Sequence, residues 1–281
     1  MGTSGVVAVL GGGSMGRAIL AGVVASSGAR AHVRVTTRTR AGAARVTSSP
    51  GVTVGDLESE PDANRIAVRD AGLVVVAVKP SRVREVLSEV RGDVAPGAVV
   101  VSVAAGVSLA ALASALPAEV AVVRAMPNTP AAIARGVTGL ARGERVTDEQ
   151  WDLVRGVFES VGIVVTVDES RIEVLGSLSG SGPAYLYLVV EQLTRAARTL
   201  GFSPEEASRL VTETFVGAAL LLAHSGAAPE DLRRQVTSPQ GTTERAIAVL
   251  EAAHLDELFV RACEAALARA RELAAELGDE S

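Results

Sequence analysis

The 281-residue sequence predicts an α/β protein in two parts: a doubly wound, mostly parallel sheet over residues 1–167 and an all-helical domain over residues 168–281. Two observations support this prediction. Short valine-rich runs alternate with helical stretches through the first part, and beyond Val167 the apolar patterns become helical. Continuous apolar runs separated by helices are typical of buried parallel strands with helices on both faces of the sheet.

The expected elements follow in chain order. The strands are Val6–Leu10, Val33–Thr37, Leu73–Val78, Val99–Val103, Val120–Arg124 and Ile163–Val167. The turn-rich segment from Pro50 to Pro61 is expected to form a loop and a short helix. The helices of the second domain are Pro183–Leu200, Pro204–Ala223, Thr242–Ala253 and Leu255–Leu277. Pro204 at the start of one helix and Gly226 past its end are the usual helix boundary residues.

The helix expected at Pro183–Leu200 is apolar on most of its faces. A helix of this kind has to be enclosed by other protein. A second copy of the chain would enclose it, and we therefore expect a homodimer through the helical domain. A self-contained helical bundle is the alternative.

Composition excludes several classes of function. The net charge is -5 with acidic and basic residues interspersed, which does not indicate a nucleic-acid partner. No apolar run reaches the roughly 18–20 residues that span a bilayer, and the first apolar run ends in glycines instead of a signal-peptide cleavage pattern. Cys263 is the only cysteine, and the three histidines lie far apart. We expect a cytoplasmic protein with no metal site.

A glycine-rich run after the first strand indicates a dinucleotide site. It consists of Gly11, Gly12, Gly13, Ser14, Met15 and Gly16. Its spacing is G-x-G-x-x-G, and it opens the helical run Arg17–Ala25. Glycines permit the tight turn and the close approach of the pyrophosphate, and the helix N-terminus faces the negative charge. The first domain is therefore expected to be a Rossmann domain.

The end of the second strand indicates which dinucleotide binds. A site for NAD normally carries an acidic residue there for the ribose 2′-hydroxyl. This chain has Thr36, Thr37, Arg38, Thr39 and Arg40, with no acidic residue before Asp56. Hydroxyl and guanidinium groups suit a 2′-phosphate. We predict NADPH as the preferred cofactor, with NADH as a second choice; an ordinary polar loop is the alternative.

Three further strand ends should reach the cofactor, because parallel strands deliver their carboxyl ends to one crevice. Lys79, the only lysine of the chain, precedes Pro80 after the third expected strand. Ala104 and Ala105 follow the fourth strand, and small residues there let the backbone approach a ligand. Asn128 follows the fifth strand, and its amide is expected near the nicotinamide, unless this segment is only a stiff turn.

Two Gly/Ser/Pro segments in the second half, residues 179–183 and 238–243, each precede an expected helix. Amide N–H groups at a helix start suit a carboxylate or phosphate, and Thr242 and Thr243 add hydroxyl donors. Helix capping alone is the alternative for both. Oxidation of an alcohol needs a general base, whereas a protonated imine is already electrophilic. Because the helical half has no lysine, we favour reduction of an imine in a small anionic substrate.

These segments together, in this order, resemble pyrroline-5-carboxylate reductase over essentially the whole chain. The most specific matches are residues 178–185, Leu-Ser-Gly-Ser-Gly-Pro-Ala-Tyr, and residues 236–243, Val-Thr-Ser-Pro-Gln-Gly-Thr-Thr. The resemblance implies a Rossmann domain followed by an all-α dimerisation domain, with homodimers that often assemble five at a time into a decamer. It implies reduction of 1-pyrroline-5-carboxylate to L-proline with NADPH or NADH, the last step of proline biosynthesis.

The resemblance also implies roles for individual residues. The cofactor should be lined by Gly11 to Met15, Arg38, Asn64, Ala77, Val78, Lys79, Pro80, Val103, Ala104, Ala105 and, from the helical half, Gln235. Glu169 and the turn Gly241, Thr242 and Thr243 should hold the substrate, with Ser238 in the same turn. The hydroxyl of Thr243 should bond the ring nitrogen, which makes it the expected catalytic residue.

Two positions depart from the family pattern. Gln240 stands where the family usually has glycine, and a positive φ there would cost strain on the order of 1 kcal/mol. Glu173 stands where the family favours aspartate. The alternatives to the main function are a reductase of another cyclic imine carboxylate, a hydroxyacid dehydrogenase, and a non-catalytic NADP(H)-binding sensor.

Overall fold

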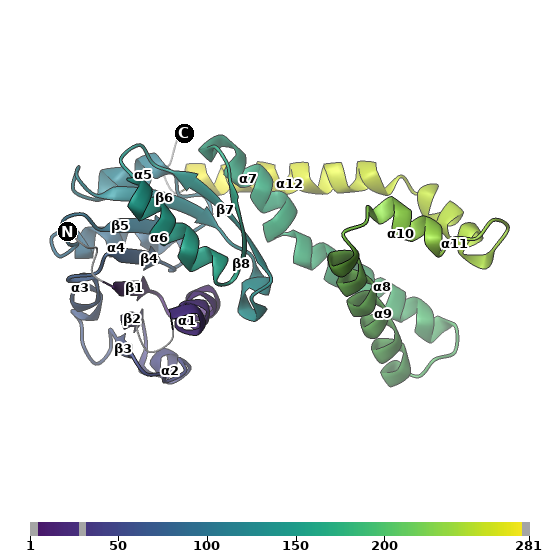
Figure 1. The fold of residues 1–281 in the computed structure, drawn as a ribbon, viewed down its shortest axis with the longest axis horizontal. Coiled ribbons are helices and arrows are strands. Elements are labelled where there is room, and N and C mark those ends of the chain that lie inside the picture. Colours follow the sequence, from purple (N-terminus) through teal and green to yellow (C-terminus); the bar gives the residue numbers. More distant parts are fainter. Residues whose placement is uncertain (1–4, 28–31, 277–281) are drawn as a thin grey trace. The chain divides into compact units, whose positions relative to one another are not determined.

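The computed structural model describes residues 5–27 and 32–276, which pack into two compact units (Figure 1). The first unit joins the residues up to Ser181 to the segment from Ala265 onward, and the second unit is Gly182–Glu264. The boundary between a Rossmann domain and a helical domain, expected after residue 167, stays a prediction.

Within the described residues, the first unit holds a sheet of eight strands in the order β3-β2-β1-β4-β5-β6-β7-β8. The strands are β1 (Val6–Leu10), β2 (His32–Thr37), β3 (Val52–Asp56), β4 (Leu73–Val76), β5 (Val99–Ser102), β6 (Ala121–Met126), β7 (Gly136–Arg142) and β8 (Gly162–Thr166). Neighbouring strands are parallel except β6 and β7, which are antiparallel. The strand order reverses between β1 and β4, the place where a doubly wound sheet opens a crevice for a ligand.

The mostly parallel, doubly wound sheet is confirmed, and each of the six expected strands is present. Two strands were not expected. Strand β3 overturns the prediction of a loop and short helix between Pro50 and Pro61, because residues 52–56 pair in parallel with β2 at the sheet edge. Strand β7 contains Gly136 and Gly139, which weakened its strand signal, and it runs against β6.

Helices cover both faces of this sheet (Figure 1). They are α1 (Ser14–Ser27), α2 (Arg40–Ala43), α3 (Ala63–Val68), α4 (Val83–Val90), α5 (Leu109–Ala115), α6 (Asp148–Glu159) and α7 (Ile172–Leu175), with short turns at Pro80–Arg82, Thr129–Ile133, Glu169–Arg171 and Gly176–Gly180. Alternate side chains of a strand enter opposite cores. On β4, Val75 belongs to the core with Ile19 of α1 and Phe158 of α6, while Val76 belongs to the core with Leu87 of α4.

The second unit is helical. It contains α8 (Gly182–Thr199), α9 (Pro204–Ser225), α10 (Pro229–Gln235), α11 (Thr242–Glu251) and the first part of α12 (Leu255–Glu276). Ser203 and Glu206 form a capping box at the start of α9, and Gly226 ends that helix with a φ of 63°. The four expected helices are confirmed, apart from Leu277, which lies outside the described residues. Helix α10 was not expected because its seven residues are too few to show a period.

Helix α8 has no buried side chain among its described residues. Large apolar side chains of α8 and α9 are exposed: Leu186, Tyr187, Leu188, Val189, Leu193, Leu210, Val216, Leu220, Leu221 and Leu222. Exposed apolar surface of this extent is typical of an interface. A single chain therefore does not enclose the apolar helix, which argues against the self-contained bundle. In the parts of the chain that the structure describes, no helix is long and apolar enough to cross a bilayer.

Candidate functional site

The glycine-rich loop connects β1 to α1 through very close backbone contacts. Gly11 has a φ of 110°, and a Cβ atom on it would lie 2.5 Å from the carbonyl oxygen of Ala77. A Cβ atom on Gly16 would lie 2.0 Å from the carbonyl oxygen of Gly11. The amides of Gly11 and Gly12 both donate to the carbonyl of Thr36, at 3.1 and 2.8 Å. The loop thus has the strand–turn–helix context of a dinucleotide fingerprint.

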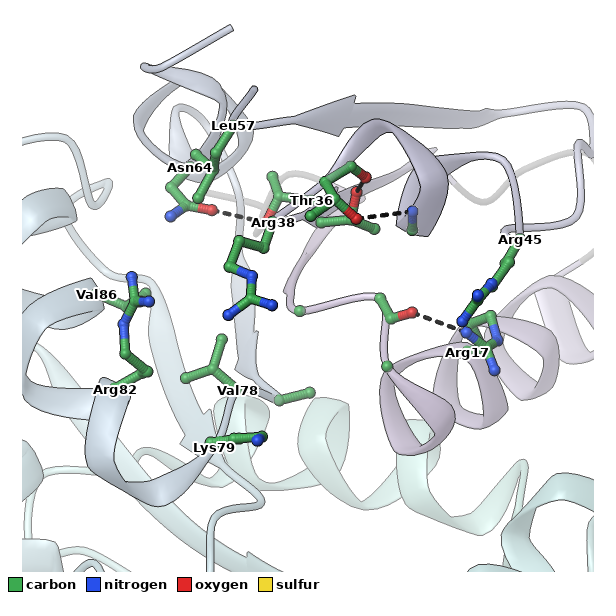
Figure 2. Close-up of a pocket in the computed structure, with 17 residues that line it drawn as sticks. Arg17, Thr36, Arg38, Arg45, Leu57, Asn64, Val78, Lys79, Arg82 and Val86 are labelled. Carbon is green, nitrogen blue, oxygen red and sulfur yellow. Dashed lines mark hydrogen bonds between the residues drawn. The ribbon is translucent and has the colours of Figure 1, made fainter. Parts of the chain in front are cut away.

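A cavity of about 340 Å³ opens where this loop meets the ends of β2 and β4 (Figure 2). Nine of the expected cofactor residues line it: Gly11, Gly12, Gly13, Thr37, Arg38, Asn64, Ala77, Val78 and Lys79. Thr36 and Thr39, from the polar run expected to face a 2′-phosphate, also line it. Sequence reasoning missed the other lining residues, which are Arg17, Gly42, Arg45, Leu57, Arg82 and Val86. Ser14 and Met15 lie just beyond the wall, in the first turn of α1.

The wall of this cavity is cationic. Its charged residues are Arg17, Arg38, Arg45, Lys79 and Arg82, and no aspartate or glutamate is among its lining residues. Figure 2 shows Arg38 reaching into the cavity from the end of β2, while Arg17 comes from α1. The Nη1 atom of Arg17 donates to the carbonyl of Gly12 at 3.1 Å, which fixes that side chain beside the loop. Such a wall suits a ligand with several phosphates.

Asn64 is held firmly in the wall. It is 3% exposed, its Oδ1 accepts from the hydroxyl of Thr36 at 2.7 Å, and its Nδ2 donates to Glu89 at 3.0 Å. A side-chain amide has two donor hydrogens. Asn64 therefore keeps one donor for a ligand in the cavity.

A second cavity of about 540 Å³ lies in the same unit and shares Lys79 with the first. Its wall consists of Lys79, Pro80, Ser81, Ala105, Gly106, Met126, Glu173, Gly176, Ser177, Ser181, Ala266, Ala270, Leu273 and Glu276. Charges of both signs line it, unlike the first cavity. Because Lys79 lies on both walls, this ammonium group stands where the two cavities meet.

The segments after β5 and β6 are held by hydrogen bonds to backbone and side-chain groups. The amide of Val103 donates to Val76 at 3.1 Å, and the amide of Ala104 donates to the hydroxyl of Ser102 at 3.2 Å. Both ends of the Asn128 amide group are engaged: Nδ2 donates to the carbonyl of Ser179, and Oδ1 accepts from the amide of Val137. The expected contact between Asn128 and the nicotinamide stays a prediction, and its observed bonds hold this loop in place.

Glu169 belongs to a cluster that sequence reasoning did not foresee. Its Oε1 atom accepts from the backbone amide of Leu109 at 2.6 Å and lies 3.4 Å from Nη1 of Arg124. The Nη2 atom of Arg124 bonds Glu173, the position that departs from the family pattern. Ion pairs between residues 45 and 49 positions apart leave no signal in one sequence.

The expected substrate turn lies in the second unit, before α11. Gly241 is the N-cap of this helix, and its amide donates to the carbonyl of Ser238 at 3.0 Å. No side chain caps the helix, so the amides of its first turn, at Thr242 and Thr243, are free of a side-chain cap. Gln235 is exposed at the end of α10. The second unit thus holds Gln235, Ser238, Gly241, Thr242 and Thr243, while Glu169 belongs to the first.

Gln240 has a φ of 61°, the left-handed conformation that favours glycine. The backbone amide of Gln240 donates to the carboxylate of Glu244 at 3.0 Å, which helps to hold the turn. Gln240 therefore has the positive φ at which a glutamine is expected to cost strain.

The expectation of an open helix start at residues 179–183 is wrong. A π-helical turn, Gly176–Gly180, precedes α8, and the amide of Ser181 is bonded to the carbonyl of Gly176 at 3.1 Å. Glycines permit this turn because Cβ atoms would meet Met126: one on Gly176 would lie 2.7 Å from its Cε. This segment therefore supports the wall of the second cavity and does not offer a free helix N-terminus.

Comparisons with known proteins agree with this geometry. Residues 169–273 match the family model described as pyrroline-5-carboxylate reductase dimerisation, and residues 6–106 match the model described as NADP oxidoreductase coenzyme F420-dependent. The first range runs from Glu169 into α12, and the second covers β1 to β5 with the glycine-rich loop.

Relatives match over nearly the whole chain. The chain is 37% identical over 270 residues to the pyrroline-5-carboxylate reductase of Corynebacterium melassecola, covering 95% of this chain and 98% of that protein. It is 36% identical over 273 residues to the enzyme of the same name from Pseudomonas aeruginosa, covering 97% and 98%. The solved structure of a pyrroline-5-carboxylate reductase from Coxiella burnetii is similar with a TM-score of 0.85 and 38% identity, over 97% of this chain and 99% of that one.

Proposed function

We propose a function that proceeds from one premise: this chain belongs to the pyrroline-5-carboxylate reductase family. The proposed reaction is the reduction of 1-pyrroline-5-carboxylate to L-proline by a nicotinamide cofactor, the last step of proline biosynthesis. The observation that carries this proposal is the cationic cavity at the carboxyl ends of β1, β2 and β4, entered by a glycine-rich loop.

The residues of the first cavity fit a dinucleotide. The loop has no room for a Cβ atom at Gly11 or Gly16, so its backbone is closely packed, and Gly13 has open space where a pyrophosphate can approach. Helix α1 begins at Ser14 and directs its amide donors at that place. When bound, the nicotinamide ring supplies the hydride. The further proposed cofactor contacts are Ser14, Met15, Gly16, Pro80, Val103, Ala104, Ala105, Asn128 and Gln235.

We propose NADPH as the preferred cofactor. Arg38 extends from the end of β2, and Arg17 and Arg45 line the same cavity without an acidic neighbour in its wall. An acidic residue there would accept the ribose 2′-hydroxyl of NADH, whereas guanidinium groups pair with a 2′-phosphate. NADH would lack that phosphate and should bind more weakly.

In the proposed reaction, a hydride adds to the imine carbon and the ring nitrogen keeps its proton, which gives the secondary amine of proline. This chain has to orient the ring, bind its carboxylate and favour the protonated imine. The turn of Ser238, Gly241 and Thr242 is proposed to bind the carboxylate, because the amides that begin α11 have no side-chain cap. The hydroxyl of Thr243 is proposed to bond the ring nitrogen, and the carboxylate of Glu169 places negative charge near the cationic ring.

The proposed assembly is a homodimer through the helical half, with a decamer of five dimers as its larger form. The dimerisation family model over residues 169–273 and the exposed apolar side chains of α8 and α9 support self-association. The cytoplasm stays the proposed location.

A spectrophotometric assay tests the function. Purified protein is mixed with 1-pyrroline-5-carboxylate and NADPH, with NADH in a parallel reaction, and the loss of absorbance of the reduced cofactor is followed while proline is measured. We expect rapid loss of NADPH with an equal amount of proline, and a slower loss of NADH. No turnover with either cofactor, in protein that binds NADPH, would overturn the proposal.

A further inference from the structure

Arg124 lies in the interior of the first unit, and its two terminal nitrogens each face a different carboxylate. It sits on β6 with 7% of its side chain exposed. Nη1 lies 3.4 Å from Oε1 of Glu169, and Nη2 bonds Oε1 of Glu173. The side chains of these acids are 33% and 23% exposed, so each lies at the boundary between the core and solvent.

Glu169 is held from a second direction by a backbone group. The amide of Leu109, the first residue of α5, donates to the same Oε1 atom at 2.6 Å. Both bonds therefore end on one oxygen of the carboxylate. Among the described residues, no donor reaches Oε2 of Glu169, and this oxygen is left for another partner.

A guanidinium group is suited to this place and an ammonium group is not. Its planar fork carries donors in fixed directions, whereas lysine offers a point charge on a flexible stem. A buried arginine cannot move away from its partners without leaving an unpaired charge in the interior. The position of Glu169 is thus set by β6 and α5, two elements of the rigid sheet domain, although Glu169 itself lies in a short helical turn.

We propose that Arg124 is a positioning residue for the substrate: it fixes Oε1 of Glu169 and so presents Oε2 to the cationic imine. This inference rests on the proposed function, in which Glu169 faces the substrate. Glu173 serves as the second anchor, because it keeps the guanidinium from turning away from Glu169. Arg124 itself touches neither substrate nor cofactor in this proposal.

A double-mutant cycle tests the proposal. Arg124→Lys, Glu169→Gln and the double variant are compared with wild type by KM for the imine, kcat, the Kd of NADPH and Tm. Arg155→Lys alters an exposed ion pair with Glu159 on α6 and is the matched control. Loss of a hydrogen bond to a charged group weakens binding by about tenfold or more. We expect Arg124→Lys and Glu169→Gln each to raise KM by about that factor and leave the Kd of NADPH unchanged, with no further rise in the double variant.

The outcomes separate this inference from the function on which it rests. Failure of the wild-type protein to reduce the imine refutes the proposed function. Normal wild-type activity with an unchanged KM in Arg124→Lys overturns the positioning role. If Arg124→Lys lowers Tm, NADPH affinity and activity together, the arginine has a merely structural role, and this result would also overturn the positioning role.

A second variant keeps the test decisive where Arg124→Lys does not fold. Glu173→Gln leaves the arginine in place and removes the charge of its second anchor. KM for the imine should then rise by about fivefold, since an anchor of this kind contributes on the order of 1 kcal/mol. An unchanged KM in a folded Glu173→Gln protein would refute the proposal.

Discussion

The backbone of Gly11 lies so close to Ala77 that a Cβ atom on the glycine would be 2.5 Å from the alanine carbonyl oxygen. Gly11 also has a φ of 110°, which side chains other than hydrogen rarely allow. The ends of strands β1 and β4 therefore meet at a point where only glycine fits, and this contact shapes the wall of the cofactor cavity.

Gly11→Ala should damage both the fold and the cofactor site. We expect the free energy of unfolding to fall by about 1–3 kcal/mol, because the change adds a clash to an unfavourable φ. Thermal unfolding without cofactor measures this loss, and NADPH titration should show weaker binding. Gly13→Ala is the control, since Gly13 has open space around it and should stay within about 0.5 kcal/mol of wild type. Equal stability of the two variants would contradict the argument.

Arg38→Ala should reduce the preference for NADPH. We expect kcat/KM with NADPH to fall by about tenfold to a hundredfold, because charged hydrogen bonds to the 2′-phosphate are lost. The value with NADH should change little. Arg45→Ala should act in the same direction, whereas Arg40→Ala is the control: Arg40 bonds Ser59 and does not line the cavity. Equal losses with both cofactors would mean that the arginine acts on something other than the phosphate.

Lys79 should be a reporter of cofactor binding. It is the only lysine of the chain, and it lines both cavities of the first unit. Pyridoxal 5′-phosphate forms an imine with a lysine amine by loss of water, and borohydride reduces this imine to a stable secondary amine. NADPH at about a hundred times its Kd should slow modification at Lys79 by about a hundredfold. Mass spectrometry measures the fraction of protein that is modified, and Lys79→Arg provides the blank. Labelling of Lys79 at the same rate with and without NADPH would place Lys79 outside the cofactor site.

Thr243→Val should lower turnover and leave cofactor affinity intact. Loss of a hydroxyl at the reacting nitrogen is expected to reduce kcat by about a hundredfold. Steady-state kinetics gives kcat, and fluorescence titration gives the Kd of NADPH. Thr237→Val is the control, because its hydroxyl already donates to the carbonyl of Arg233 at 2.6 Å. Full activity in Thr243→Val would remove Thr243 from the mechanism.

Gln240→Gly should stabilise the substrate turn. Gln240 has a φ of 61°, and glycine adopts this conformation without a Cβ penalty. We expect a gain of up to about 1 kcal/mol in the free energy of unfolding. Gln240→Ala keeps the Cβ atom and should bring no gain. A lower Tm for the glycine variant would show that the hydrogen bond from the backbone amide of residue 240 to Glu244 depends on the glutamine.

Local signals account for the parts of the fold that the sequence predicted. The loop at Gly11–Gly16 and the helix bounded by Pro204 and Gly226 are both found as expected, because sterics and capping act over a few residues. Strand β3 escaped prediction because Pro50 and Gly51 indicate a turn. The strand forms because its backbone pairs with β2, a partner that neighbouring residues do not specify.

The candidate site shows the same division. Arg38 was predicted from its place at a strand end, whereas Arg17 and Arg45 reach the cavity only because helix and loop turn toward it. The pairing of Arg124 with Glu169 was equally invisible, since one lies on a central strand and the other on a later turn. Residues that are far apart in the sequence and meet only in the folded chain cannot be identified as one site without the structure.

The exposed apolar side chains of α8 and α9 have a consequence for handling the protein. When a folded surface of this kind is covered by a second copy, association adds to stability by mass action. Dilution should then lower the melting temperature, and activity at nanomolar protein should decline over time. Because of this surface, stocks should be kept at high protein concentration. Each measured rate should be given together with the protein concentration of the assay.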